Sequence, residues 1–193
     1  ISPNKIYPEF YHDLNQVLRT GKVALFQLRL KKYSLKQKII IGKKIQQICK
    51  KNNIKFIVND DPILSKKLNA DGCHLGQKDM SVKNARKIIG NKIIGITCHN
   101  SIRLAKAAIT ENVSYIAFGA FFSTVTKKVK FKANTKILKE IKKLTNTPIV
   151  AIGGINFDNY KKLLLNNANL LAISGYVWNN KKYKPLETIE KLK

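Results

Sequence analysis

The chain has 193 residues, 44% of them hydrophobic, which is enough for one sizeable core, so we expect residues 1–193 to form a single domain. Its formal charge of +26 suggests a nucleic-acid-binding module, but the lysines are spread over almost every expected helix, which argues against a nucleic-acid partner. No apolar run approaches the roughly 20 residues that cross a bilayer and no signal peptide opens the chain, so we expect a soluble, cytoplasmic protein without a membrane partner.

Short apolar runs alternate with helical patterns along the chain, which is typical of repeated strand–helix units around a parallel sheet. The first element is residues 1–3, ISP, which we interpret as the end of an opening strand; because Ile1 is not an initiator methionine, we expect that strand to be truncated. The other expected strands are rich in Val, Ile and Leu, as strands covered on both faces are. They lie at residues 22–29, 54–59, 72–75, 92–97, 114–119, 147–153 and 169–174.

The segments between these strands carry apolar residues at helical spacing, and Ser34, Asn100 and Asn156 precede three of them as expected N-caps. Eight strand–helix units in one short chain predict an α/β fold of the closed (β/α)8 TIM-barrel type, compact relative to the usual size of about 250 residues. An open doubly wound sheet is the alternative. It would need a glycine-rich turn such as GxGxxG after the first strand, and the chain has none there.

Polar residues follow nearly every expected strand, and in a TIM barrel the carboxyl ends of the strands meet at one rim that holds the active site. Asp60 and Asp79 follow neighbouring strands, so their carboxylates are expected to converge there. Two such hard oxygen ligands suit Mg²⁺, whose other positions are filled by water and substrate phosphates. The alternative is that each acid caps the helix after it, near Pro62 for Asp60 and at Met80 for Asp79.

Further groups that bind anions are expected on the same rim. Gln27, Arg29 and Lys31 alternate along one strand, point the same way and predict a pyrophosphate clamp. A separate phosphate site is expected from the loop after the 114–119 strand and from the last two strand ends, where barrels often hold a phosphate. Its candidate residues are Thr124, Thr126, Lys127, Gly153, Gly154, Ile173 and Ser174. A clamp and a separate phosphate site imply two phosphorylated small molecules as ligands.

Taken in order, six stretches resemble the successive signatures of thiamine phosphate synthase, a family related to thiazole tautomerase. They are QLRLK, VNDDPILSKKLNADGCHLGQKDM, IIGITCHN, AFGAFFSTVTKK, PIVAIGGI and the ISG near the end of the chain. The resemblance covers almost the whole chain, and the combination of ND, HLGQxD, TxTK and AIGGI at this spacing is highly specific. It implies a Mg²⁺-dependent transferase of thiamine biosynthesis. Such an enzyme joins 4-amino-5-hydroxymethyl-2-methylpyrimidine diphosphate to a thiazole phosphate through an ionised pyrimidine cation, giving thiamine monophosphate and pyrophosphate.

Position by position, the resemblance implies a role for each residue of the rim. The catalytic residues would be Arg29, Lys31, Thr97 and Lys127. The diphosphate would be held by Gln27, Arg29, Lys31, Asn59 and Lys127, the metal by Asp60 and Asp79, and the thiazole phosphate by Thr124, Thr126, Gly154, Ile173 and Ser174. Thr97 replaces the usual Ser of the family and would lie beside the pyrimidine and the pyrophosphate.

Departures from the family pattern fall on loops. Ser123 replaces the usual Pro before TxTK, Asp61 replaces a common Arg, and residues 129–134 lack the expected Gly and Pro. Loop closure and thiazole recognition are therefore where this chain would differ from its relatives.

Two histidines carry different expectations. His99 would serve the alternative function, a thiazole tautomerase-like isomerase, because a histidine titrates near neutral pH and could move protons on a thiazole. That relative typically lacks the paired acids, both of which are present here. His74 is expected to pack under the rim with a satisfied hydrogen bond. Homo-oligomerisation is left open by the sequence.

Overall fold

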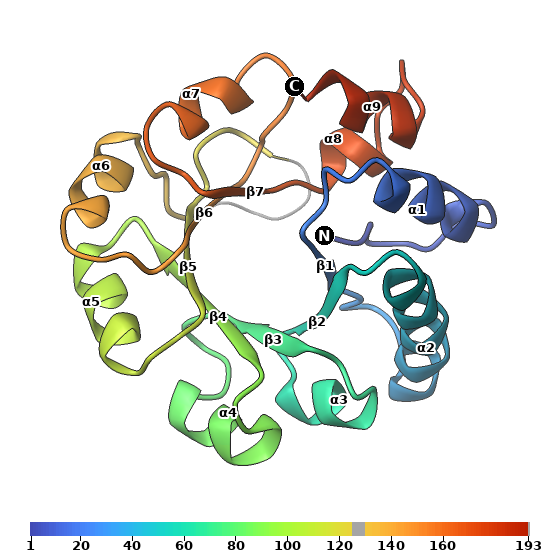
Figure 1. Ribbon diagram of the computed structural model, residues 1–193, viewed down its shortest axis with the longest axis horizontal. Coiled ribbons are helices and arrows are strands. Elements are labelled where there is room, and N and C mark those ends of the chain that lie inside the picture. The colour runs from blue at the N-terminus through green and yellow to red at the C-terminus, as the bar shows by residue number, and fades with distance from the viewer. Residues whose placement is uncertain (125–129, 193) are drawn as a thin grey trace.

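The computed structural model describes residues 1–124 and 130–192. Within them, seven parallel strands form one sheet in chain order, and Figure 1 shows them around a common centre with the helices outside. The strands are β1 (Leu25–Leu28), β2 (Lys55–Asn59), β3 (Gly72–Leu75), β4 (Ile93–His99), β5 (Tyr115–Gly119), β6 (Ile149–Ile152) and β7 (Leu170–Ala172). A doubly wound sheet would reverse its strand order part-way, so the predicted TIM-barrel architecture is confirmed and the open alternative is wrong.

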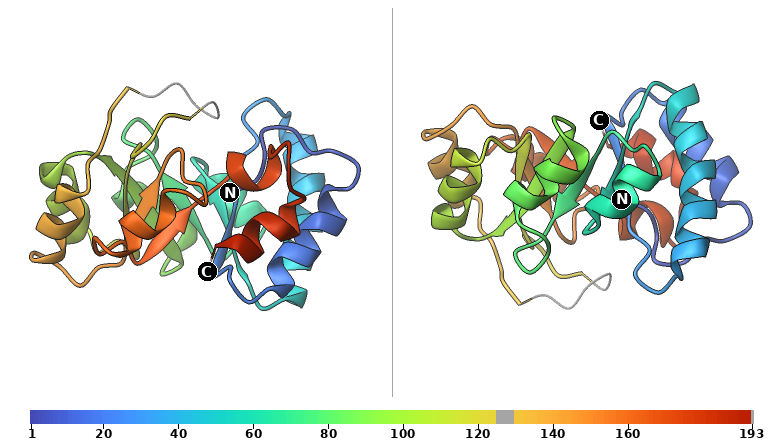
Figure 2. Two further views of the ribbon diagram at one scale, coloured as in Figure 1. Left: turned by 90° about the horizontal axis from the view of Figure 1, so that it is seen from above. Right: turned by 90° about the horizontal axis from the view of Figure 1, so that it is seen from below.

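A layer of helices covers the outside of the strands. The helices are α1 (Phe10–Arg19), α2 (Leu35–Lys51), α3 (Pro62–Lys67), α4 (Val82–Ile89), α5 (Ile102–Thr110), α6 (Lys136–Lys142), α7 (Tyr160–Leu164), α8 (Gly175–Trp178) and α9 (Pro185–Lys191). Figure 2 shows that α1 and α2 lie on the opposite side of the strands from α5 and α6. None of the helices within residues 1–124 and 130–192 is long and apolar enough to cross a membrane.

The predicted N-caps are right for one helix and wrong for two. Ser34 caps α2 in a capping box, as predicted. The cap of α5 is Ser101 and not Asn100, since the Ser101 hydroxyl accepts the backbone N–H of Leu104. Asn156 lies in the turn before α7, where its side chain accepts the N–H of Asp158 at 3.0 Å. Ser and Asn are comparable caps, so the path of the chain out of the strand decides which one is used.

Residues 1–3 fill the position between β1 and β7 without being a regular strand. The N–H of Ser2 donates to the carbonyl of Gln27 at 2.8 Å, and the carbonyl of Ser2 accepts from the hydroxyl of Ser174 at 3.1 Å. Figure 1 shows this segment beside β1. The predicted opening strand is therefore a short hydrogen-bonded segment that links the two edges of the sheet.

Side chains that alternate along the strands enter two different cores. Phe26 and Phe56 point outward and pack with residues of α1, α2 and α3. Inside the barrel, a smaller cluster is formed by Ile57, Tyr115, Ala117 and Val150. Gln27 lies in register with Ile57, so it also points into the barrel.

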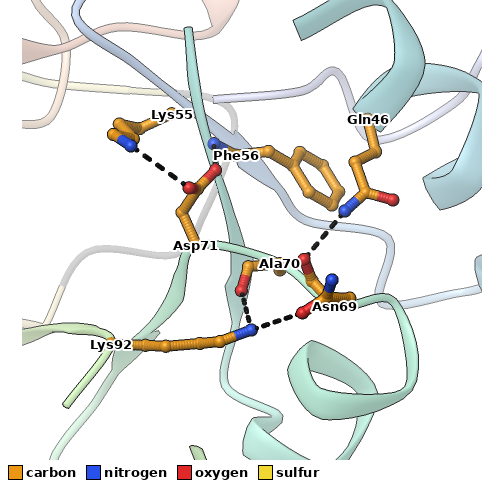
Figure 3. Close-up of polar contacts among 7 residues, drawn as sticks. All are labelled: Gln46, Lys55, Phe56, Asn69, Ala70, Asp71 and Lys92. Carbon is orange, nitrogen blue, oxygen red and sulfur yellow. Dashed lines mark hydrogen bonds and ion pairs between the residues drawn. The ribbon is translucent and has the colours of Figure 1, made fainter. Parts of the chain in front are cut away.

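Polar side chains tie together the amino ends of β2, β3 and β4 (Figure 3). The carboxylate of Asp71 accepts the backbone N–H of Phe56 at 2.8 Å and lies 3.4 Å from Lys55 Nζ. Lys92 Nζ donates to the side-chain oxygen of Asn69 at 2.7 Å. In TIM barrels this face serves stability, and the opposite face carries the chemistry.

Candidate active site

The end of β1 carries the predicted diphosphate clamp. Gln27 is buried inside the barrel, and Arg29 and Lys31 follow it on the rim. The guanidinium of Arg29 donates to the side-chain oxygen of Asn4 at 3.0 Å, and its backbone N–H donates to the Ser2 hydroxyl at 2.8 Å. Ser2 and Asn4 thus hold Arg29 in place. The sequence offers no signal for either residue, because so short a segment has no periodic pattern.

Asp60 is not a helix cap. The cap of α3 is Asp61, whose carboxylate accepts the N–H of Leu64 at 2.9 Å. Asp60 has a φ of 66°, donates its N–H to the carbonyl of His74 at 2.7 Å, and its carboxylate lies 3.0 Å from Lys31 Nζ. The capping alternative for Asp60 is therefore wrong, and its carboxylate faces the end of β1.

Asp79 is not a helix cap either. The cap of α4 is Ser81, and one carboxylate oxygen of Asp79 accepts the N–H of Gly76 at 2.7 Å. Burial raises the pKa of Asp79, and the nearby carboxyl of Asp60 raises it further. The two acids therefore converge, as their positions after neighbouring strands predict.

A cavity of about 200 Å³ opens at the ends of β1 and β2. Leucine and valine side chains form its apolar wall. Its polar lining consists of Lys31, Lys38, Asn59, Asp60 and Asp61. The cavity thus gathers three of the predicted site residues, while Arg29 and Asp79 are not part of its lining.

The two acids fit the predicted metal by their chemistry. In the described part of the chain, no three His, Cys, Asp or Glu side chains group together as a metal site. Mg²⁺ is commonly bound through one or two carboxylates, with water and substrate phosphates as its other ligands. Burial is the main cause of the raised pKa of Asp79, and the proximity of Asp60 adds to it; a cation between the two carboxylates would offset both effects.

Thr97 lies near the end of β4, above a buried histidine. Its hydroxyl is 2.8 Å from His74 Nε2, and its carbonyl accepts from the side-chain amide of Gln77 at 2.6 Å. His74 is only 6% exposed, and its Nδ1 lies 2.8 Å from the hydroxyl of Tyr115. The prediction that His74 packs under the rim with its hydrogen bonds satisfied is confirmed.

Gly153 and Gly154 form a tight turn after β6. Their φ angles are 102° and 66°, which favour glycine. A Cβ on Gly154 would collide with the carbonyl oxygen of Ser123 and with the backbone of Phe122. The loop after β5 therefore packs directly on this predicted phosphate-binding turn.

Ile173 and Ser174 end the barrel beside the N-terminal segment. The hydroxyl of Ser174 donates to the carbonyl of Ser2, and the hydroxyl of Ser2 accepts the N–H of Arg29, so the two halves of the predicted site are neighbours around the rim. The carbonyl of Ile173 accepts from the nitrogen of Ile1 at 3.0 Å. Thr124 is half-buried in the loop after β5. Thr126 and Lys127 lie outside the described residues.

His99, the base of the alternative isomerase function, packs against an aromatic ring. It ends β4 with a φ of 55°, and its ring centroid lies 4.4 Å from that of Phe131. This contact gives His99 a packing role at the rim.

Comparisons with known proteins agree with the motifs. A family model described as thiamine monophosphate synthase matches residues 1–177. The thiamine-phosphate synthase of Pelagibacter ubique (strain HTCC1062) is 66% identical over 195 residues, which cover 100% of this chain and 94% of that protein. The thiamine-phosphate synthase of Rhodospirillum centenum (strain ATCC 51521 / SW) is 37% identical over 182 residues, which cover 93% of this chain and 88% of that protein.

Solved structures agree as well. Thiamine phosphate pyrophosphorylase from Pyrococcus furiosus has a TM-score of 0.86 and 26% identity, and the match covers 99% of this chain and 90% of that chain. A 3-hexulose-6-phosphate synthase from Salmonella typhimurium, at 14% identity and a TM-score of 0.73, shares the fold alone. The resemblance seen in the motifs is confirmed over the whole chain, which belongs to the thiamine monophosphate synthase family.

Proposed function

We propose that this protein is a Mg²⁺-dependent alkyl transferase that joins 4-amino-5-hydroxymethyl-2-methylpyrimidine diphosphate to a thiazole phosphate, releasing pyrophosphate and forming thiamine monophosphate. The observation that carries the proposal is the convergence of Lys31, Asp60 and Asp79 at the ends of neighbouring strands in a chain of this family. The high identity to a protein named thiamine-phosphate synthase supports the same reaction.

The reaction makes its largest electrostatic demand at the leaving group. The bond between the pyrimidine methylene carbon and the diphosphate oxygen breaks, and its electron pair leaves with the diphosphate. The nitrogen of the thiazole then attacks the pyrimidine cation and forms the new C–N bond. Preorganised positive charge around the departing oxygens is the most effective way to lower such a barrier.

Arg29 and Lys31 suit this demand. Asn4 and Ser2 hold the guanidinium and the backbone of Arg29, so its planar fork is oriented before the substrate arrives. Lys31 is 54% exposed, and its ammonium pairs with Asp60 in the free protein, so it can turn to a phosphate oxygen at little cost. Asn59 adds an amide to the cavity at the ends of β1 and β2, which Lys31 also lines.

Asp60 and Asp79 would hold the metal. When bound, Mg²⁺ would neutralise charge on the diphosphate as it departs. The hydrogen bond from Gly76 N–H fixes one oxygen of Asp79, and the ion pair with Lys31 holds Asp60 in the free protein. The carboxylates are therefore oriented by the chain itself.

The second substrate would bind around the later strands. Gly154, Ser174 and Thr124 belong to β6, β7 and β5 units whose ends lie on the same rim. The positive φ angles of Gly153 and Gly154 shape this turn, and its backbone N–H groups would bind the phosphate. Ser2 connects Ser174 to Arg29, so the thiazole phosphate would lie next to the diphosphate.

The test is synthesis from both phosphorylated precursors with Mg²⁺, with thiamine monophosphate detected by mass spectrometry. Asp60→Asn is expected to lower kcat by about 100-fold or more, the usual effect of removing one electrostatic stabiliser. Asp61→Asn is the matched control, because it makes the same charge change one residue away and Asn remains a good helix cap. Absence of product with folded wild-type protein, or equal losses in the two variants, would refute the proposal.

A further inference from the structure

A chain of hydrogen bonds crosses the interior of the barrel beneath the candidate site. It links three side chains from three strands. The hydroxyl of Tyr115 on β5 lies 2.8 Å from Nδ1 of His74 on β3. Nε2 of the same ring lies 2.8 Å from the hydroxyl of Thr97 on β4. Tyr115 and His74 are 8% and 6% exposed, so these are buried contacts whose geometry is set by packing.

The fold makes room for this chain of hydrogen bonds, called the relay below, at one glycine. Gly95 on β4 lies in register with His74 on one side and with Tyr115 on the other. A Cβ at Gly95 would collide with the ring of Tyr115. The Tyr115 ring therefore occupies the space of the missing side chain, and it stacks on His74 with ring centroids 5.6 Å apart and an interplanar angle of 19°.

The hydrogen bonds can run in one direction. Burial raises the pKa of Tyr115, so the phenol stays protonated and has a proton to donate. A phenol is a better donor than acceptor, and its oxygen lies 2.8 Å from His74 Nδ1, so the inferred direction is from the Tyr115 hydroxyl to Nδ1. Because Nδ1 accepts, the ring carries its proton on Nε2 and donates it to the oxygen of Thr97.

The last member of the relay lies at the level of the acidic pair. His74 and Gly95 are in register, and so are Leu75 and Ile96, which brings the following residues, Gly76 and Thr97, level with each other. Gly76 is the residue whose N–H holds Asp79. Because the hydroxyl oxygen of Thr97 accepts from His74 Nε2, the hydroxyl proton of Thr97 remains available for a partner on the rim.

We propose that Tyr115 and His74 are positioning residues that set the Thr97 hydroxyl as a hydrogen-bond donor toward an anionic oxygen of the diphosphate. This rests on the proposed function, because it needs a diphosphate at the rim. With His74 in its other tautomer, the Thr97 proton would be spent on Nε2, and the hydroxyl would offer only lone pairs to a negatively charged ligand. The relay thus prevents the Thr97 hydroxyl from turning its lone pairs toward the negatively charged diphosphate.

The tautomer of His74 tests the relay without any substrate. The chain has three histidines, so long-range ¹⁵N–¹H NMR spectra of ¹⁵N-histidine-labelled protein, assigned with a His74→Gln variant, can identify this ring. The wild type is expected to show the proton on Nε2. Tyr115→Phe removes the donor to Nδ1 and is expected to move His74 toward the Nδ1-protonated form. A wild-type ring protonated on Nδ1, or a tautomer unchanged in Tyr115→Phe, would overturn the proposal.

Steady-state kinetics tests the consequence for the reaction. Tyr115→Phe and Thr97→Val are each expected to lower kcat/KM for the pyrimidine diphosphate by about 10- to 100-fold, the value of a hydrogen bond to a charged group, with KM for the thiazole phosphate unchanged. The double variant should lose no more than the worse single variant, because both remove the same donor. Thr97→Ser should restore activity. Additive losses would indicate two separate structural defects and would overturn the relay.

The outcomes separate this inference from the proposed function. If the wild type makes no thiamine monophosphate, the proposed function fails and the tautomer of His74 alone decides whether the relay has the inferred direction. If the wild type is active and folded Tyr115→Phe is equally active, the relay fails and the function stands. If Tyr115→Phe does not fold, the Thr97→Val and Thr97→Ser pair and the wild-type tautomer still decide.

Discussion

Lys31 and Asp60 form an ion pair across the ends of β1 and β2, with Nζ 3.0 Å from the carboxylate oxygen. The ammonium of Lys31 is therefore already paired with Asp60, one of the two acids that we expect to hold Mg²⁺. In the free protein Lys31 is therefore expected to compete with Mg²⁺ for Asp60, and in the substrate complex it would help to bind the diphosphate. The same side chain is thus expected to have opposite effects on metal and substrate binding.

Lys31→Met tests these opposite effects. Without substrate, the variant is expected to bind Mg²⁺ more tightly by up to about fivefold, because an exposed ion pair is worth at most about 1 kcal/mol. Its KM for the pyrimidine diphosphate is expected to rise by about tenfold or more, since a charge-assisted hydrogen bond is lost. Calorimetric titration and steady-state kinetics measure the two effects. Lys32→Met, the same charge change at the next, exposed residue, should show neither.

The pKa of Asp79 predicts a pH dependence of stability. Burial and the neighbouring Asp60 raise this pKa, so the folded protein binds the Asp79 proton more tightly than the unfolded chain does. Folding is therefore favoured below the raised pKa, and stability is lost as the pH rises through it. Asp79→Asn should remove this loss. The free energy of unfolding of the variant, relative to the wild type, is expected to increase with pH when metal is absent.

Urea unfolding at a series of pH values measures this difference. Mg²⁺ provides the control, because it should stabilise only a protein that keeps both acids. At 100 times its Kd a ligand adds about 2.7 kcal/mol to the free energy of unfolding. The wild type should gain this amount near neutral pH and Asp79→Asn should gain none. Equal stabilisation of both proteins would show that Mg²⁺ binds elsewhere.

The turn at Gly154 predicts a defect in binding the second substrate. An added methyl group would collide with the backbone at Ser123 and Phe122, and a φ of +66° is unfavourable for alanine. Gly154→Ala is expected to raise KM for the thiazole phosphate by about tenfold, as a shift of about 1 Å in a positioning element is enough to do. KM for the pyrimidine diphosphate should change far less.

Gly21→Ala is the matched control for backbone strain. Gly21 has a similar φ of +70°, and a Cβ there meets no heavy atom of the described residues within 4 Å. Both variants should lose about 1 to 2 kcal/mol of stability through the positive φ. Only Gly154→Ala should change substrate binding, which isothermal titration can measure. A comparable rise in KM in Gly21→Ala would point to a general loss of stability.

Asp71 is expected to affect stability and not catalysis. It lies at the amino ends of the strands, where it accepts the N–H of Phe56 (Figure 3). Asp71→Ala leaves that buried N–H without its partner, which costs about 1 to 3 kcal/mol in the free energy of unfolding. Lys55→Met removes only the exposed ion pair and should cost at most about 1 kcal/mol. At temperatures where both variants are folded, kcat should match the wild type.

Much of the fold could be predicted from the sequence because strands buried on both faces are apolar runs. All seven strands found in the described residues overlap their predicted ranges, from Leu25–Leu28 to Leu170–Ala172. The opening segment at residues 1–3 was harder, since its partners Gln27 and Ser174 are distant in sequence. The starts of α5 and α7, at Ser101 and Asn159, also differed from prediction. At α5 the neighbouring Ser101 caps the helix in place of Asn100, because Ser and Asn are comparable caps.

The sequence by itself determined the strand–helix order, the polar residues that follow the strands and the family. Only the tertiary structure decided that Asp61 and Ser81 cap the helices and leave Asp60 and Asp79 facing each other. It also decided that Ser2 holds Arg29 and that a tyrosine fills the space beside Gly95. The physical reason is that capping and strand formation depend on residues close in the chain, whereas these contacts join residues from different strands whose distances are set by closure of the barrel.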